Sequence, residues 1–312
     1  MTMRSTTPAI LVAAALLAVG EVSSAEETMA LDVASLFAEG LSTQSSSTDV
    51  RLAAQTSESI YTQVAMTPDT AADDKTWVLV APYGWMPATR GTVGARGVTT
   101  KVDASLADVF ESLGDLNGAV MGHVEVGKND WGLIFDGLLM RLSPEKNLPL
   151  GGKATVEISS TLLESMAMKR ILDTTTDVPG MSRIRADLLA GARYYQVQSN
   201  LKINPVMGPT IQGDISKDWV DLVFGGRTSV TVADGLEGFL RADFGGFGIG
   251  TSSDLTWNLI AGGEYACPGC PGSSLVLGYR ILDIKEKQGS GNDEFIYDVQ
   301  MQGPFAAVAF RF

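Results

Sequence analysis

From Thr76 to the last residue, the sequence repeats segments in which apolar and polar residues alternate. Clusters of glycine, asparagine, aspartate and proline separate these segments. A period of two is the pattern of a β-strand with one apolar face. No uninterrupted apolar run approaches the roughly 18 residues that a membrane-spanning helix needs. We therefore predict an all-β domain of antiparallel strands.

The segments predict about ten strands, an even number, as single-chain bacterial β-barrels have. The connection from Leu172 to Arg183 is long for a tight turn, and that from Gly248 to Asp254 is brief for an outer loop, so eight to twelve strands fit the sequence. The predicted strands are Thr76 to Met86, Asn117 to Val126, Trp131 to Leu142, Ala154 to Met166, Ile184 to Ile203, Asp218 to Val232, Leu236 to Phe247, Leu255 to Ala266, Ser273 to Ile284 and Glu294 to Phe312.

Short and long connections alternate along the predicted domain. Transmembrane up-and-down barrels of the outer membrane keep tight turns on the periplasmic side and longer loops outside. This alternation predicts such a barrel, with both termini in the periplasm. The short connections include Gly127 to Asp130, Ala233 to Gly235 and Cys267 to Gly272; the long ones include Pro87 to Leu116, Ser143 to Lys153, Asn204 to Lys217 and Lys285 to Asp293.

Most charged residues share one face of their predicted strand. An arginine on the lipid face at the bilayer midplane would cost about 2–4 kcal/mol, so the charged face should point into the lumen. A barrel of about ten strands is narrow, and these side chains would nearly fill it, which argues against a wide pore. The predicted lumenal charge network comprises Glu125, Asp136, Glu157, Arg185, Asp187, Arg193, Asp221, Arg227, Arg241, Asp243, Glu264, Arg280 and Asp298, together with His123.

The last predicted strand changes its pattern part-way. Apolar residues occupy odd positions from Tyr297 to Met301 and even positions from Ala306 to Phe310. Gly303 and Pro304 lie at the change, where a β-bulge would re-aim the side chains. We therefore expect a bulge there.

One segment of the first long loop has helical spacing. Ser105 is a candidate N-cap, and Leu106, Val109, Phe110 and Leu113 share one face. The sequence predicts a short helix from Ser105 to Leu113 that packs over the barrel mouth or folds into the lumen as a plug.

The amino-terminal region has the features of an exported protein. Arg4 is followed by an apolar stretch from Pro8 to Val19 and by small residues up to Ala25, as in a signal peptide. We predict a signal peptide over residues 1–25 and a flexible periplasmic extension over residues 26–75, where Ser, Thr, Ala, Gln and Asp are abundant.

Cys267 and Cys270 flank a Pro-Gly pair. In an exported chain, a disulfide that closes a tight turn is the better interpretation. The alternative, a thioredoxin-like redox motif, needs a βαβ setting that the sequence does not predict.

The sequence indicates no metal or other cofactor, because His123 is the only histidine and no second cysteine pair exists. The net charge of −13 argues against nucleic acid as a partner. His123 with Glu125 and Asp136 could form an acid–base cluster, although a histidine within a charged network is more often structural.

Four sequence motifs resemble a group of largely uncharacterised, porin-like outer-membrane β-barrel proteins of Gram-negative bacteria. The resemblance implies outer-membrane lipid and the barrel-assembly machinery as partners, with Phe310 and Phe312 as the carboxy-terminal insertion signal. It implies no substrate. The motifs are Trp77 to Trp85 (WVLVAPYGW), Asp243 to Gly250 (DFGGFGIG), Leu277 to Arg280 (LGYR) and Gln302 to Phe312 (QGPFAAVAFRF).

Three functions remain open at this stage. The first, which we expect, is a non-enzymatic outer-membrane barrel that is structural or forms a narrow channel for a small solute through its charged lumen. The second is a soluble exported lipocalin-like barrel that binds an apolar ligand, with an apolar interior and a charged exterior. The third is an outer-membrane enzyme that uses His123 and lumenal carboxylates.

Overall fold

The computed structural model describes residues 76–95, 98–111, 116–143, 145–147, 153–204 and 211–312. The predicted signal peptide and periplasmic extension lie outside these residues. No helix within the described ranges is long and apolar enough to cross a membrane.

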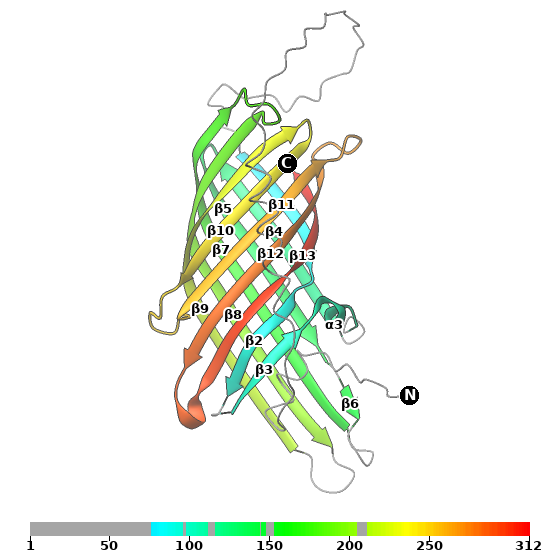
Figure 1. Ribbon diagram of the computed structural model, residues 1–312, viewed down its shortest axis with the longest axis vertical. Coiled ribbons are helices and arrows are strands. Elements are labelled where there is room, and N and C mark those ends of the chain that lie inside the picture. The colour runs from blue at the N-terminus through cyan, green and yellow to red at the C-terminus, as the bar shows by residue number, and fades with distance from the viewer. Residues whose placement is uncertain (1–75, 96–97, 112–115, 144, 148–152, 205–210) are drawn as a thin grey trace, which may run out of the picture. The chain divides into compact units, whose positions relative to one another are not determined.

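Ten antiparallel strands form a closed barrel in which each strand pairs with the next one in the ring (Figure 1). The ring closes where β1 pairs with both β4 and β13, as in the pair of Leu79 with Arg311. The predicted all-β barrel is therefore confirmed. The strands are β1 (Thr76–Trp85), β4 (Leu116–Lys128), β5 (Trp131–Leu142), β7 (Lys153–Thr175), β8 (Arg183–Asn204), β9 (Ile211–Ala233), β10 (Leu236–Gly246), β11 (Leu255–Ala266), β12 (Ser273–Gln288) and β13 (Phe295–Arg311).

Three further strands lie in segments that the sequence predicted as loops. β2 (Ala88–Ala95) and β3 (Val98–Ala104) form a hairpin within the first long connection, and β2 pairs with the beginning of β13. β6 (Glu145–Asn147) pairs with β7, and a short 3₁₀ turn, η3 (Gly291–Asp293), precedes β13. Small and polar residues make up most of β2 and β3, so their alternation was too weak to predict strands.

The connections divide the barrel into two ends. The tight turns lie at the end that holds Thr76 and the carboxy-terminus, which we call the turn end; the longer connections lie at the opposite loop end (Figure 1). The backbone of Phe312 is fixed there, because its N–H donates to the Val78 carbonyl at 2.9 Å and its carbonyl accepts from the Val78 N–H at 3.1 Å. β7 continues to Thr175, beyond its predicted end at Met166. β9 begins at Ile211, before its predicted start at Asp218.

The outer wall of the barrel is apolar. Neighbouring strands present large hydrophobic side chains to the outside, and the arginines Arg227, Arg241 and Arg280 point inward. This is the sidedness of a membrane barrel and the opposite of a soluble lipocalin-like barrel. Exposed residues on the wall include Val120, Leu133, Phe135, Leu139, Leu163, Leu188, Val220, Leu222, Phe224, Leu240, Phe244, Leu275, Leu277, Val308 and Phe310.

The β-bulge predicted at Gly303 and Pro304 in the last strand is absent from the structure. Val299 and Ala309 are both buried while Asp298 and Val308 are exposed, so odd positions face inward along all of β13. The pairing with β12 continues without a register shift. What changes is the interior itself, which is apolar around Val299.

Gly303 has a different role from the predicted bulge. A Cβ atom at this position would lie 2.0 Å from the carbonyl oxygen of Met86, where β1 gives way to β2. Glycine is therefore needed for close backbone approach at this junction.

The predicted short helix is present as α3 (Leu106–Glu111). Ser105 caps it, since the Asp108 N–H donates to Ser105 Oγ at 3.3 Å and the Ser105 N–H donates to Asp108 Oδ2 at 2.8 Å. The helix lies beside β2 and β3 at the barrel wall, with Phe110 exposed, and does not plug the lumen (Figure 1).

A charge on the apolar wall tests the sidedness. Leu222→Arg should destabilise the folded barrel in lipid vesicles by about 2–4 kcal/mol, because Leu222 faces outward at mid-strand. Asn200→Arg, on an exposed position near the loop end of β8, should change stability little. Urea unfolding measures both, and equal effects would contradict this sidedness.

Candidate functional site

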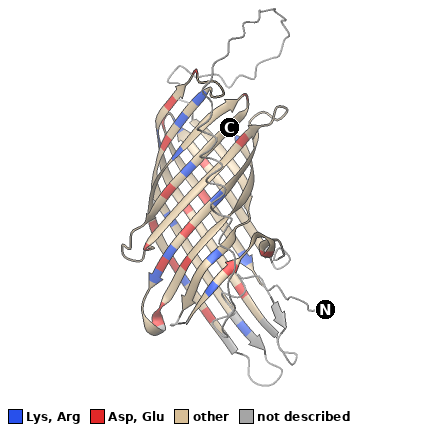
Figure 2. Ribbon diagram, viewed as in Figure 1, with Lys and Arg blue, Asp and Glu red and all other residues tan. Residues whose placement is uncertain are grey.

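The barrel interior is divided along its length into two regions. The half toward the turn end holds most of the buried ionised side chains, whereas the half toward the loop end is lined by apolar and aromatic residues. Figure 2 shows acidic and basic residues interspersed along the barrel strands. Both regions arise from the inward face of the same strands.

Glu164 on β7 is the centre of the charged region, and it is 4% exposed. Its carboxylate accepts two hydrogen bonds from Arg193, at 2.8 Å to Nε and 2.5 Å to Nη2, and another from Arg241. Asp243 joins the same two arginines, at 2.6 Å from Arg193 Nη2 and 3.0 Å from Arg241 Nε. Two carboxylates and two guanidinium groups thus neutralise one another.

A chain of contacts extends this cluster around the barrel. The Asn258 amide donates to Asp243 Oδ2 at 2.9 Å and accepts from Arg280 Nε at 3.0 Å. Arg280 then forms an ion pair of 3.5 Å with Asp136, which also accepts from the Tyr83 hydroxyl at 3.0 Å. Side chains from opposite walls therefore meet across the lumen.

His123 joins the second part of the network. One ring nitrogen, Nδ1, lies 3.1 Å from Asp136, and the other, Nε2, lies 2.9 Å from Glu125. Arg227 contacts Glu125 and also Asp187, at 3.0 Å from its Nη2 atom.

The predicted acid–base trio does come together, but every polar atom of the His123 ring is engaged by a carboxylate.

Arg170 Nε also donates to Asp187 Oδ1 at 3.0 Å. The groups described so far form one connected set, which we call the central network. Its members are the carboxylates Glu125, Asp136, Glu164, Asp187 and Asp243, the arginines Arg170, Arg193, Arg227, Arg241 and Arg280, and Tyr83, His123 and Asn258.

Further ion pairs lie nearer the turn end. Arg185 contacts Glu237, and Glu264 accepts from Arg311 Nη2 at 2.7 Å. The side chain of Arg311 is 44% exposed, whereas those of Arg185 and Glu237 are about one-fifth exposed, as is that of Arg227 in the central network. These pairs neutralise the charge of the lumen near its turn-end opening.

Two of the predicted lumenal residues are on the wrong face. Glu157 is exposed between buried Val156 and Ile158, so it lies outside. Asp298 is exposed beside buried Val299 for the same reason. Both positions are near the loop end, where the inward face is apolar and the outward face carries the charges.

Asp221 is buried but does not belong to the central network. Its Oδ1 atom accepts a hydrogen bond of 2.7 Å from the Ser253 N–H, so it holds the connection between β10 and β11. The structure places the other predicted residues inside, and the contacts above account for each of them.

Sequence reasoning missed several members of the central network. Glu164 was overlooked because both faces of β7 carry apolar residues, so alternation could not decide which of Glu157 and Glu164 faces inward. Tyr83, Arg170 and Asn258 lack any signal of their own; only the spatial neighbourhood of Asp136, Asp187 and Asp243 identifies them.

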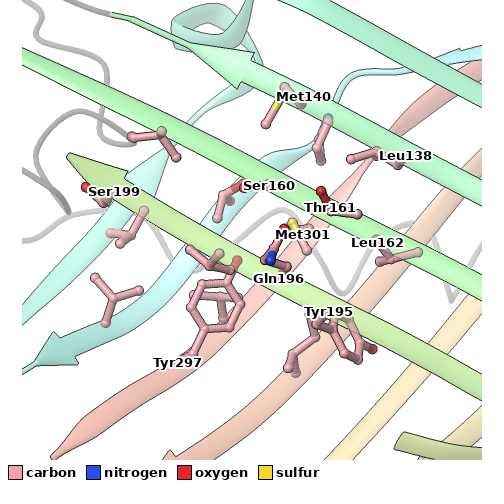
Figure 3. A pocket seen from close by; sticks show the side chains of 18 of the residues that line it. Leu138, Met140, Ser160, Thr161, Leu162, Tyr195, Gln196, Ser199, Tyr297 and Met301 are labelled. Carbon is pink, nitrogen blue, oxygen red and sulfur yellow. The ribbon is translucent and has the colours of Figure 1, made fainter. Parts of the chain in front are cut away.

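On the loop-end side of the central network, the interior opens into an apolar cavity of about 250 Å³, which we call the chamber. Figure 3 shows side chains from β5, β7, β8 and β13 converging on it. Few polar side chains reach it, among them Ser160 and Ser199. Its apolar lining includes Trp85, Val93, Val102, Met121, Leu138, Met140, Leu142, Ile158, Leu162, Tyr195, Ile284, Phe295, Tyr297, Val299 and Met301.

Aromatic residues separate the chamber from the central network. The guanidinium of Arg280 lies 5.0 Å from the ring centre of Trp85, whose indole N–H donates to the Gly303 carbonyl at 3.2 Å. Tyr195 stacks on Trp219 at 5.0 Å between ring centres. One cation–aromatic contact thus joins the charged region to the apolar one.

Cys267 and Cys270 form a disulfide in the tight turn between β11 and β12, as the sequence predicted. Within the described residues, no group of three or more histidine, cysteine, aspartate or glutamate side chains could hold a metal ion.

Comparisons with known proteins found no matching family model and no matching curated protein. Among solved structures, the outer-membrane protease OmpT of Escherichia coli is 9% identical, with a TM-score of 0.46 over 77% of this chain and 98% of that one. The translocator domain of the autotransporter NalP from Neisseria meningitidis is 13% identical, with a TM-score of 0.36 over 78% of this chain and 90% of that one.

The attachment invasion locus protein Ail of Yersinia pestis is 12% identical, with a TM-score of 0.29 over 76% of this chain and 98% of that one. These likenesses are too weak to carry an argument about function. The closed barrel, its apolar wall and its charged interior rest on this protein's own structure, which has the architecture of an outer-membrane β-barrel.

Removing one member of the central network should lower the free energy of unfolding of the barrel. Glu164→Ala leaves Arg193 and Arg241 without a shared carboxylate, and breaking a buried pair in this way costs about 3–5 kcal/mol. Glu157→Ala, on the outer face of the same strand, should cost far less. Urea unfolding in lipid vesicles compares the two, and equal losses would contradict the assignment of faces in β7.

Proposed function

We propose that this protein is a non-enzymatic outer-membrane β-barrel whose midsection is closed to ions and solutes, so that it acts as a structural barrel and not as a channel. The observation that carries the proposal is the burial of the central network: Arg193 is fully buried, and Glu164, Asp243 and Arg280 are at most 5% exposed. A water-filled pore would leave these groups hydrated.

Apolar side chains close the space between the charged ones. Ile134, Met166, Leu189 and Val223 pack together inside the barrel beside the network and are at most 3% exposed. Interiors packed at this level hold few voids as large as a water molecule. The combination of neutralised charge and dense packing supports a sealed midsection.

The exterior supports placement in the outer membrane of a Gram-negative bacterium. The wall carries large apolar side chains, and Trp131 and Tyr265 are exposed near the turn end, where an interfacial aromatic girdle would lie. Barrels of this class have tight turns on the periplasmic side. Both termini would therefore be periplasmic, with residues 1–25 removed after export and residues 26–75 preceding the membrane domain at 76–312.

The proposed partners follow from this placement. Membrane lipid would cover the wall, and the barrel-assembly machinery would recognise the terminal strand, where Phe310 and Phe312 are both exposed. The network does not favour catalysis, because Glu125 and Asp136 occupy both ring nitrogens of His123. A group held in this way has no free atom with which to act on a substrate.

Conductance across a planar lipid bilayer tests the proposal. The native protein should give no current steps, since the network blocks the lumen. Replacing Glu164, Arg193 and Arg241 together by serine should open a water path and produce steps.

The matched control replaces Glu157, Asp298 and Asn200, which are exposed outside the lumen, by serine. This variant should remain silent. Current steps from the native protein would contradict the sealed barrel and favour the narrow channel.

A further inference from the structure

The wall around the chamber is not continuous. β1 pairs with β4 only from Thr76 to Pro82, where Pro82 lies opposite Gly122. Proline has no N–H to donate and is therefore suited to the end of a ladder. Beyond this point the chain leaves β4 but stays paired with β13, first up to Trp85 and then through β2, and β3 returns beside β2.

A lateral seam results between β3 and β4. Among the strands that the structure describes, β3 pairs only with β2, and the beginning of β4, up to Met121, pairs only with β5. No backbone ladder joins the two strands across this seam. The barrel is closed by β1 at its turn half and opens sideways at its loop half.

The chamber reaches the seam. Its lining includes Val102 on one side, Ala119 and Met121 on the other, and Val109 of α3, which lies in the chain between the two strands. Side chains from both edges and from the adjoining helix thus form one apolar surface with the interior. The seam is therefore a side opening of the chamber.

The two rims of the seam differ in polarity. On the β4 side, Val120 is 68% exposed and lies opposite Leu139, which is also exposed, so the apolar wall extends to this rim. On the hairpin side, Arg90 and Asp103 form an exposed ion pair. Unpaired strand edges do not occur within the hydrocarbon of a membrane. The polar hairpin therefore sets the seam at the boundary between membrane and water.

From this arrangement we propose that the chamber binds the hydrocarbon chain of an amphiphile, which enters through the seam and leaves its polar head at the polar rim. An apolar cavity of about 150 Å³ stays dry and binds benzene, and the chamber is larger, at about 250 Å³. The sealed midsection closes the chamber on its turn-end side, at Trp85, so the hydrocarbon chain enters and leaves through the seam. The chain belongs to a membrane lipid or to a free fatty acid.

Quenching of Trp85 fluorescence by a brominated chain tests the proposal, because Trp85 lines the chamber. The protein is held in phosphatidylcholine discs and titrated with 11-bromoundecanoic acid. We expect saturable quenching that Trp85→Phe removes. In a second arm the discs contain phosphatidylcholine with brominated chains and no free acid.

Quenching of Trp85 in the first arm identifies a free fatty acid as a ligand, and quenching in the second identifies the chain of a membrane lipid; either result supports the proposal. Absence of Trp85 quenching from both arms overturns it.

Two pairs of variants locate the ligand. Ala119→Phe fills the chamber at the seam and should weaken the quenching of Trp85 at least tenfold, whereas Val120→Phe, at the outward-facing neighbour, should preserve it. Ser160→Phe, two strands away from Ala119 on the chamber wall, should act like Ala119→Phe, and Ser159→Phe at its neighbour should not. Circular dichroism verifies that each variant folds, and the Ser160 and Ser159 pair is used if Ala119→Phe does not fold. Equal quenching within the pairs that fold would overturn the proposal.

Discussion

The need to neutralise charge inside a narrow barrel governs this structure. Lipid-facing positions exclude ionised groups, so these groups lie on the inner face, where water is scarce. There a carboxylate or guanidinium is tolerated only with partners of opposite charge and good hydrogen-bond geometry. Glu164 meets this condition through Arg193 and Arg241, which come from strands on different parts of the ring. The central network consequently ties most of the barrel strands together.

The same constraint explains why the interior changes along its length. Charges that pair across the lumen close it, and the aromatic side chains of Trp85, Tyr195 and Trp219 cover the pairs on the loop side. Beyond them the inward face is apolar, and charges such as Glu157 and Asp298 lie on the outward face. One barrel therefore combines a polar seal with an apolar chamber. In the function that we propose, the charged region seals the barrel, and in the binding mode that we infer, the chamber holds a ligand that does not cross the membrane.

Alternation predicted the class of fold and most of the strands, because a period of two is imposed locally on every strand. Trp131–Leu142 and Leu255–Ala266 match their predicted bounds. Local pattern could not show that the inner face turns from charged to apolar, since this depends on depth in the barrel. For this reason the sequence placed Asp298 in the lumen, although it lies outside, and did not identify Glu164 as a lumenal residue. The chamber and the seam also depend on which strands meet in space, a property that no single segment encodes.

The sidedness of the wall is the central claim, and spin labels along β10 test it most directly. In lipid vesicles, labels at Leu240, Ala242 and Phe244 should collide with oxygen, which concentrates in hydrocarbon, and should be protected from a water-soluble nickel chelate. A label at Phe239, on the inward face of the same strand, should be less accessible to oxygen than a label at its outward neighbour Leu240. Labels at the three outward positions that collide freely with the chelate and not with oxygen would contradict the account.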